Sequence, residues 1–154
     1  MGLIGGLTTA AQLAMAPLPN IEPVSLIFLL CGATFGLQTL FAAAVFVLLE
    51  GLVFGFGPWW FSYLYLWPLA VLLGALFRRM EGALPWALLS GFYGLAFGTL
   101  SALIFLPFGG VALFFSTVLS GIPFDLLHCG GNFAIMLLCY RPLRRLLRRY
   151  GPPD

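Results

Sequence analysis

Residues 84–106 read LPWALLSGFYGLAFGTLSALIFL, a stretch of 23 residues without a charged side chain. An α-helix needs about 20 mainly apolar residues to cross the hydrocarbon core of a bilayer. The stretch therefore predicts a membrane-spanning helix, and the residues on either side of it show how many more the chain holds.

The whole chain has the same apolar character. Apolar residues make up 62% of the 154 residues and charged residues only 8%, whereas soluble domains carry about 25% charged residues. Five acids, seven arginines and one histidine cannot cover a water-facing surface, so lipid must cover most of the protein. The net charge of +2 does not indicate binding to nucleic acid, because the arginines are clustered where membrane topology requires them.

Proline, glycine and charged residues divide the sequence into six candidate spans. They cover residues 2–16, 22–36, 38–54, 62–78, 84–106 and 120–141. We therefore expect an all-α integral membrane protein, a compact bundle of about six transmembrane helices that forms one substrate-binding domain over residues 1–154. The apolar region 107–120 begins with a proline and two glycines, Pro107, Gly109 and Gly110. We interpret it as a long outer loop packed against the bundle, although a re-entrant helix would give the same pattern.

The arginines predict the orientation. They occur only at 78–79 and 141–149, and cytoplasmic flanks of membrane helices collect arginine and lysine. With six spans, both clusters fall on one side. We therefore expect a multi-pass protein of the bacterial cell membrane with a cytoplasmic C-terminus. The basic amphipathic tail 143–150 is typical of a segment that contacts anionic lipid headgroups.

Sequence motifs for cofactors and catalysis are missing. Cys31, Cys129 and Cys139 form no CxxC or Cys/His spacing, so neither a disulfide framework, a metal site nor a bound cofactor is indicated. No HExxH, GxSxG or paired-carboxylate pattern occurs, so we expect no catalytic residues and no enzyme activity.

Three polar residues fall on one face of the last candidate helix. Asp125, His128 and Asn132 are spaced i, i+3 and i+7, which places them within an arc of about 60°. A charge at the centre of a span costs roughly 2.5–3.5 kcal/mol, so such groups usually have a function. Glu50 lies at a similar depth in the third candidate helix. We expect these four residues to bind substrate.

Aromatic residues gather at the same outer end of the predicted bundle. Trp59, Trp60 and Tyr63 fit either an interfacial belt or the wall of a pocket. An outward cavity with aromatic walls and a few hydrogen-bonding groups suits a small, flat molecule with polar edges. We include all three residues in the candidate substrate site.

Small residues follow one another at every fourth position in two candidate helices. The first row is Gly2, Gly6, Ala10 and Ala14, and the second is Ser90, Gly94, Gly98 and Ala102. Such rows let helices approach closely. They fit packing within the bundle, and the first row also fits docking of a separate protein.

Three segments carry a family resemblance. They are AAQLA at 10–14, which contains an AxxxA pair, PLPNIEPV at 17–24 and GIPFDLLHCGGNF at 121–133. Along nearly its whole length the chain resembles the substrate-binding S components of energy-coupling factor (ECF) transporters. The resemblance implies a subunit that captures a vitamin or related micronutrient from outside the cell. A transmembrane coupling subunit and two cytoplasmic ATPases would drive the uptake.

The resemblance also implies roles for individual residues. The AxxxA face of S components contacts the coupling subunit, which assigns this role to Ala10 and Ala14, with Gly6 in the same row. An asparagine or lysine of the last helix contacts the ligand, which suggests Asn132. The chain has no Walker A motif, so ATP hydrolysis would belong to other chains. A structural membrane protein of the MreD type and a solitary vitamin carrier are the two alternatives.

Overall fold

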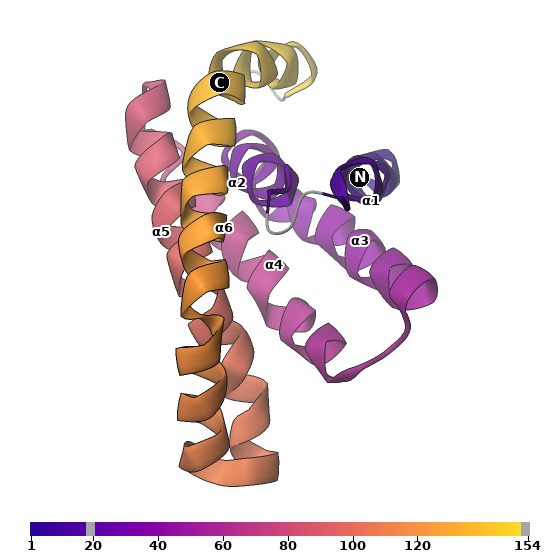
Figure 1. Ribbon diagram of the computed structural model, residues 1–154. Coiled ribbons are helices and arrows are strands. Elements are labelled where there is room, and N and C mark those ends of the chain that lie inside the picture. The colour runs from indigo at the N-terminus through magenta and orange to yellow at the C-terminus, as the bar shows by residue number, and fades with distance from the viewer. Residues whose placement is uncertain (18–20, 152–154) are drawn as a thin grey trace.

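The computed structural model describes residues 1–17 and 21–151, and within these residues all regular structure is helical (Figure 1). The helices are α1 (Gly2–Met15), α2 (Val24–Phe35), α3 (Thr39–Phe54), α4 (Pro58–Leu76), α5 (Ala83–Ala102) and α6 (Leu106–Tyr150). Two short 3-10 helices, η1 (Gly36–Gln38) and η2 (Leu103–Phe105), join α2 to α3 and α5 to α6. The expected all-α class is confirmed. Residues 18–20 of the segment 17–24 lie outside the described residues.

The expected six transmembrane helices are not found. In the described part of the chain, three helical stretches are long and apolar enough to cross a membrane: Val24–Phe54, Pro58–Leu76 and Ala83–Tyr150. The helix α1 has only 14 residues, about 21 Å at 1.5 Å per residue, which is shorter than the hydrocarbon core. The helices α2 and α3 are joined directly by η1, so together they form the stretch Val24–Phe54. The three stretches indicate a multi-pass membrane protein.

The interpretation of residues 107–120 as an outer loop is wrong. These residues are helical and form the first part of α6, which continues to Tyr150. Gly110 has a non-helical backbone, with φ of 62° and ψ of −161°, and interrupts the helix. The chain turns back near this residue, because Gly98 of α5 lies against Asp125 and Gly91 lies against Cys129 on the returning segment. The region has no proline between 107 and 123. The glycines therefore allow a tight turn between two helical segments, where the sequence suggested a long loop.

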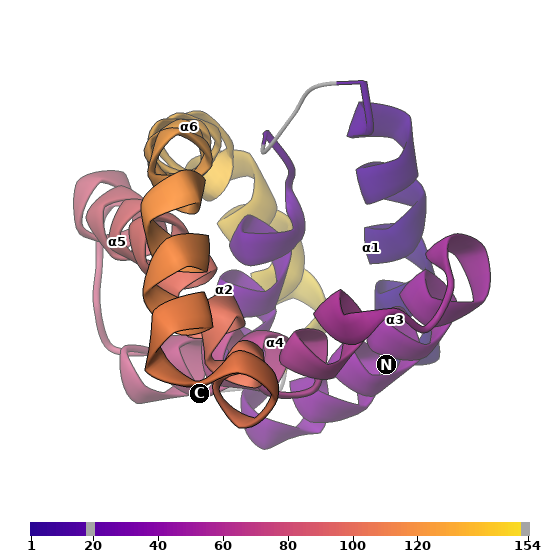
Figure 2. The same ribbon diagram turned by 60° about the horizontal axis from the view of Figure 1, so that its bottom comes forward.

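The two longest helices form a hairpin that reaches beyond the others. Figure 1 shows α5 and α6 side by side and joined at one end, with α3 and α4 forming a second, V-shaped pair. The helix α2 packs against α4 and α6, and α1 packs against α3 (Figure 2). The arrangement brings α1, the start of α2, α3 and α6 around one polar region.

The core between these helices is aromatic. The rings of Phe28, Phe46 and Trp67 lie 5.4–5.7 Å apart and join α2, α3 and α4. Gly32 of α2 and Gly74 of α4 lie so close to the opposite backbone that a methyl group at either position would collide with it. Small residues at such contacts let membrane helices pack backbone against backbone. The glycines thus set the spacing of α2 and α4 beside the polar region.

The arginine-rich segments lie at one end of the structure. The Trp86 indole N–H donates a hydrogen bond of 2.9 Å to the Met80 carbonyl, and the Trp86 ring stacks against Tyr140 at 6.5 Å. The helix α6 contains Pro142, a residue that kinks helices. Its last turns bend away from the axis of the hairpin (Figure 1). We call residues 143–150 the C-terminal arm.

Candidate ligand-binding site

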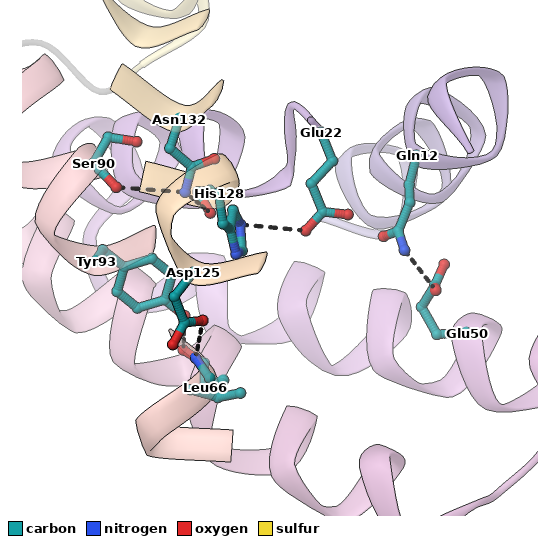
Figure 3. A network of polar contacts seen from close by, with 11 residues as sticks. Gln12, Glu22, Glu50, Leu66, Ser90, Tyr93, Asp125, His128 and Asn132 are labelled. Atoms are coloured by element: carbon teal, nitrogen blue, oxygen red, sulfur yellow. Dashed lines mark hydrogen bonds and ion pairs between the residues drawn. The ribbon is translucent and has the colours of Figure 1, made fainter. Parts of the chain in front are cut away.

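The first part of the site is a buried carboxyl group that pairs with an amide. Glu50 of α3 is 1% exposed, and its Oε2 accepts a hydrogen bond of 3.1 Å from Nε2 of Gln12 in α1 (Figure 3). The other oxygen of each group, Oε1 of Gln12 and Oε1 of Glu50, is buried and has no hydrogen-bond partner among the described residues. A buried polar atom without a partner lowers the stability of the folded protein by about 1–3 kcal/mol, so a ligand that donates hydrogen bonds to these two oxygens would bind favourably.

A cleft opens beside this pair. It has a volume of ≈ 210 Å³ and is lined by Gln12, Glu50, Phe54, Trp59 and Tyr63. The rings of Trp59 and Tyr63 meet edge to face at 5.1 Å, which gives one wall an apolar aromatic surface. The cleft thus combines aromatic rings with two unpaired acceptors, which is the composition of a site for a small molecule with N–H or O–H groups.

Glu22 lies between this pair and α6. Its Oε1 is 3.8 Å from Nε2 of His128, too far for a hydrogen bond, and Figure 3 shows it between His128 and the Gln12–Glu50 pair. Its side chain is 17% exposed. Burial of the carboxyl group, together with the nearby charge of Glu50, raises the pKa of Glu22 from 4.5 to about 7. Glu22 therefore lies between the Gln12–Glu50 pair and the last helix, and its carboxyl group can change its charge near neutral pH.

The other side chains of the α6 stripe contact neighbouring helices. Asn132 is 1% exposed, and its Nδ2 donates hydrogen bonds to Ser25 Oγ at 3.1 Å and to the Ser90 carbonyl at 3.4 Å. Asp125 Oδ1 accepts a hydrogen bond of 3.0 Å from the backbone N–H of Gly98. Neither residue lines the cleft of Gln12 and Glu50. These contacts make the stripe part of the junction of α6 with α2 and α5.

The structure divides the substrate residues predicted from the sequence into groups. Glu50, Trp59 and Tyr63 line the cleft together. Trp60 does not line the cleft, and its indole N–H donates a hydrogen bond of 2.8 Å to the Val47 carbonyl. In the α6 stripe, His128 packs against Phe97 with ring centroids 4.8 Å apart and faces Glu22.

Sequence reasoning missed Gln12 as a cleft residue. Gln12 is the only long polar side chain in α1, where every other residue is apolar, glycine or threonine. Polar groups are costly in an apolar helix, so this exception could have been recognised. Glu22 is the first residue of the predicted span 22–36, but nothing in its spacing showed that it faces His128.

The small-residue row of α1 lies on the outer face of the helix. Ala10 and Ala14 are exposed, and nothing lies within 4 Å of a methyl group placed on Gly6. The opposite face, which includes Gly5 and Gln12, contacts α3. The row of α5 differs, because Gly94 and Gly98 lie directly against α6.

Comparison of the chain with protein-family models, curated proteins and solved structures gives no match.

Proposed function

We propose that this chain is the substrate-capturing subunit of an ECF-type importer. It binds a small vitamin-like molecule in the cleft of Gln12, Glu50, Trp59 and Tyr63. It operates in the bacterial cell membrane with its arginine-rich end in the cytoplasm. The sequence segments that resemble S components support this proposal, and so does the composition of the cleft.

The observation that carries the proposal is the pair of unpaired acceptors in the cleft. The free oxygens of Gln12 and Glu50 point to a ligand that donates hydrogen bonds through N–H or O–H groups. Trp59 and Tyr63 supply an aromatic wall for a flat, apolar part of the same ligand. A helix-packing role alone leaves the two oxygens without partners.

A second observation favours a subunit that works with partners over a solitary carrier. The outer face of α1 presents Gly6, Ala10 and Ala14 without any covering helix in the described part of the chain. Small exposed residues in a row provide a flat surface on which a helix of another membrane protein can pack. The partner of this surface is the transmembrane coupling subunit, which brings two cytoplasmic ATPases with it.

Native mass spectrometry of freshly purified protein tests ligand capture. We expect a small molecule to remain bound to the wild type and to be lost from Glu50→Gln. This substitution replaces one of the two carboxylate oxygens, both of which are acceptors, by an NH2 group, which is a donor. Glu81→Gln makes the same substitution at an acid that does not line this cleft and serves as the matched control. No bound molecule in any preparation, or equal retention by wild type and Glu50→Gln, contradicts the assignment of the cleft.

Affinity purification in a mild detergent tests the assembly. An importer subunit copurifies with a coupling subunit and ATPases, whereas a solitary carrier brings down neither. A structural protein of the MreD type would copurify with other membrane proteins and retain no small molecule. The two measurements together distinguish the three possibilities.

A further inference from the structure

A second cleft lies at the arginine-rich end of the structure. Its volume is ≈ 420 Å³, twice that of the cleft beside Glu50. The connection before α5 contributes Glu81 and Gly82 to its lining. The C-terminal part of α6 contributes Tyr140, Arg141, Arg144, Arg145 and Arg148. This cleft shares no residue with the candidate substrate site.

The cleft carries a strong positive charge. Four of its lining residues are arginines and one is an acid, Glu81. In the part of the chain that the structure describes, the one close acid–base pair joins Glu22 and His128, so none of these four guanidinium groups is paired with a carboxylate there. Guanidinium groups that share one cleft repel each other, and an anion bound between them would remove that repulsion.

One of the four arginines, Arg144, is held in place by the fold. Arg144 Nη1 donates a hydrogen bond of 2.8 Å to Thr34 Oγ1 at the end of α2. Arg144 Nε is buried and has no hydrogen-bond partner among the described residues. Leu147 is buried against the core and fixes the C-terminal arm from the same side. The cleft is therefore formed by an anchored helix, and the cost of ordering it is already met in folding.

We propose that this cleft is a binding site for a phosphate group. Guanidinium groups match phosphate oxygens through paired hydrogen bonds, and the match is closer than for a monovalent halide. The phosphate can come from the headgroup of an anionic phospholipid or from a soluble phosphate compound. The site differs from a diffuse basic surface because it uses only some of the arginines: Arg78, Arg79 and Arg149 do not line it.

The test measures binding of a defined lipid to two double variants with the same net charge. Arg145→Gln/Arg148→Gln removes two arginines of the cleft, and Arg79→Gln/Arg149→Gln removes two exposed arginines outside it. Native mass spectrometry in a maltoside detergent follows the first bound molecule of dioleoylphosphatidylglycerol. Dioleoylglycerol, which lacks the phosphate, is the lipid control. Arg144 is left unchanged because it holds the arm to Thr34.

We expect the affinity for dioleoylphosphatidylglycerol to fall by about tenfold or more in the cleft variant and by less than about twofold in the control variant. Equal losses in both variants would show a diffuse basic surface and overturn the proposal. So would equal binding of dioleoylglycerol.

Thermal unfolding with each probe identifies the source of the phosphate. Stabilisation by the phospholipid alone assigns the site to lipid headgroups. Stabilisation by millimolar inorganic phosphate, lost in the cleft variant, assigns it to soluble phosphate compounds. Absence of both effects contradicts the site.

Discussion

The Gln12 amide of α1 donates a hydrogen bond of 3.1 Å to Oε2 of Glu50 in α3. The same helix presents Ala10 and Ala14 on its outer face. One short helix thus contributes to the cleft on one side and to the proposed docking surface on the other. A ligand that moves the Gln12 side chain would act directly on the helix that meets the coupling subunit.

The first prediction concerns this amide. Gln12→Leu removes one acceptor of the cleft and the donor to Glu50, so the affinity for the retained ligand should fall by about 5- to 150-fold. Equilibrium binding of the ligand identified by mass spectrometry measures the change. Gln38→Leu makes the same substitution at an exposed position of η1 and should leave the affinity unchanged. Equal affinities of Gln12→Leu and wild type would remove Gln12 from the site.

The second prediction concerns the contact between α5 and α6. A methyl group on Gly98 would collide with the Asp125 carboxyl group, whereas a methyl group on Gly130, an exposed glycine of α6, meets nothing within 4 Å. Gly98→Ala should destabilise the protein by roughly 1–3 kcal/mol, the usual cost of overpacking. Gly130→Ala should be neutral or slightly stabilising, since alanine favours the helix.

Unfolding in detergent, followed by circular dichroism, measures both glycine variants. If the Gly98 effect arises from the collision, Asp125→Ala in the same chain should recover part of the loss. A Gly98→Ala protein as stable as the Gly130→Ala protein would contradict the close contact.

The positions of most helices could be predicted from the sequence. The candidate spans 2–16 and 38–54 correspond closely to Gly2–Met15 and Thr39–Phe54. The agreement arises because proline and glycine at the ends of an apolar run often mark the ends of a helix. The number of membrane crossings could not be predicted in this way. Gly36 and Gly110 both have φ of 62°, and each interrupts a helical run. Other glycines, such as Gly94 and Gly98, lie inside helices, so a glycine in the sequence does not by itself show where the chain turns back.

The site was predictable only in part for a similar reason. Spacing placed Asp125, His128 and Asn132 on one face of α6, but it could not show what that face meets. It meets Gly94 and Gly98 of α5 and Ser25 of α2, so packing accounts for two of its three side chains. Glu50, Trp59 and Tyr63 come together because the short connection 55–57 folds α4 back beside α3.

The third prediction follows from this difference for Asn132. Because its amide bonds to Ser25 and to the Ser90 carbonyl, Asn132→Ala should lower stability by about 1 kcal/mol, a typical value for hydrogen bonds between membrane helices. A double-mutant cycle with Ser25→Ala measures the coupling of the two side chains. A large loss of ligand affinity without loss of stability would return Asn132 to the substrate site, where the sequence placed it.

The fourth prediction concerns pH and Glu22. The pKa of this carboxyl group is about 7 in the folded protein and 4.5 in its ordinary state, so the folded state holds the proton more tightly. The stability contributed by protonated Glu22 is therefore complete below about pH 4.5 and is lost as the pH rises towards 7. Burial and the charge of Glu50 raise the pKa of Glu22, and His128 Nε2 lies 3.8 Å from its carboxyl group.

Thermal midpoints in detergent between pH 4.5 and 8 check this dependence. The wild type should lose stability across the interval from 4.5 to 7, and Glu22→Gln should lose less, because its side chain does not titrate. Parallel curves for the two proteins would show that another group causes the dependence.

The fifth prediction concerns the outer face of α1. Replacing Ala10 and Ala14 by leucine adds bulk where the coupling subunit would pack, so association and ATP-driven uptake should fall while ligand binding in the isolated subunit persists. Ala134→Leu makes the same change at an exposed alanine of α6 and serves as the matched control. Copurification with the coupling subunit and uptake of labelled ligand are the two measurements. A double variant that still assembles and transports as the control does would place the docking surface elsewhere. Loss of ligand binding in the isolated subunit would show instead that the substitutions disturb the face of the helix that carries Gln12.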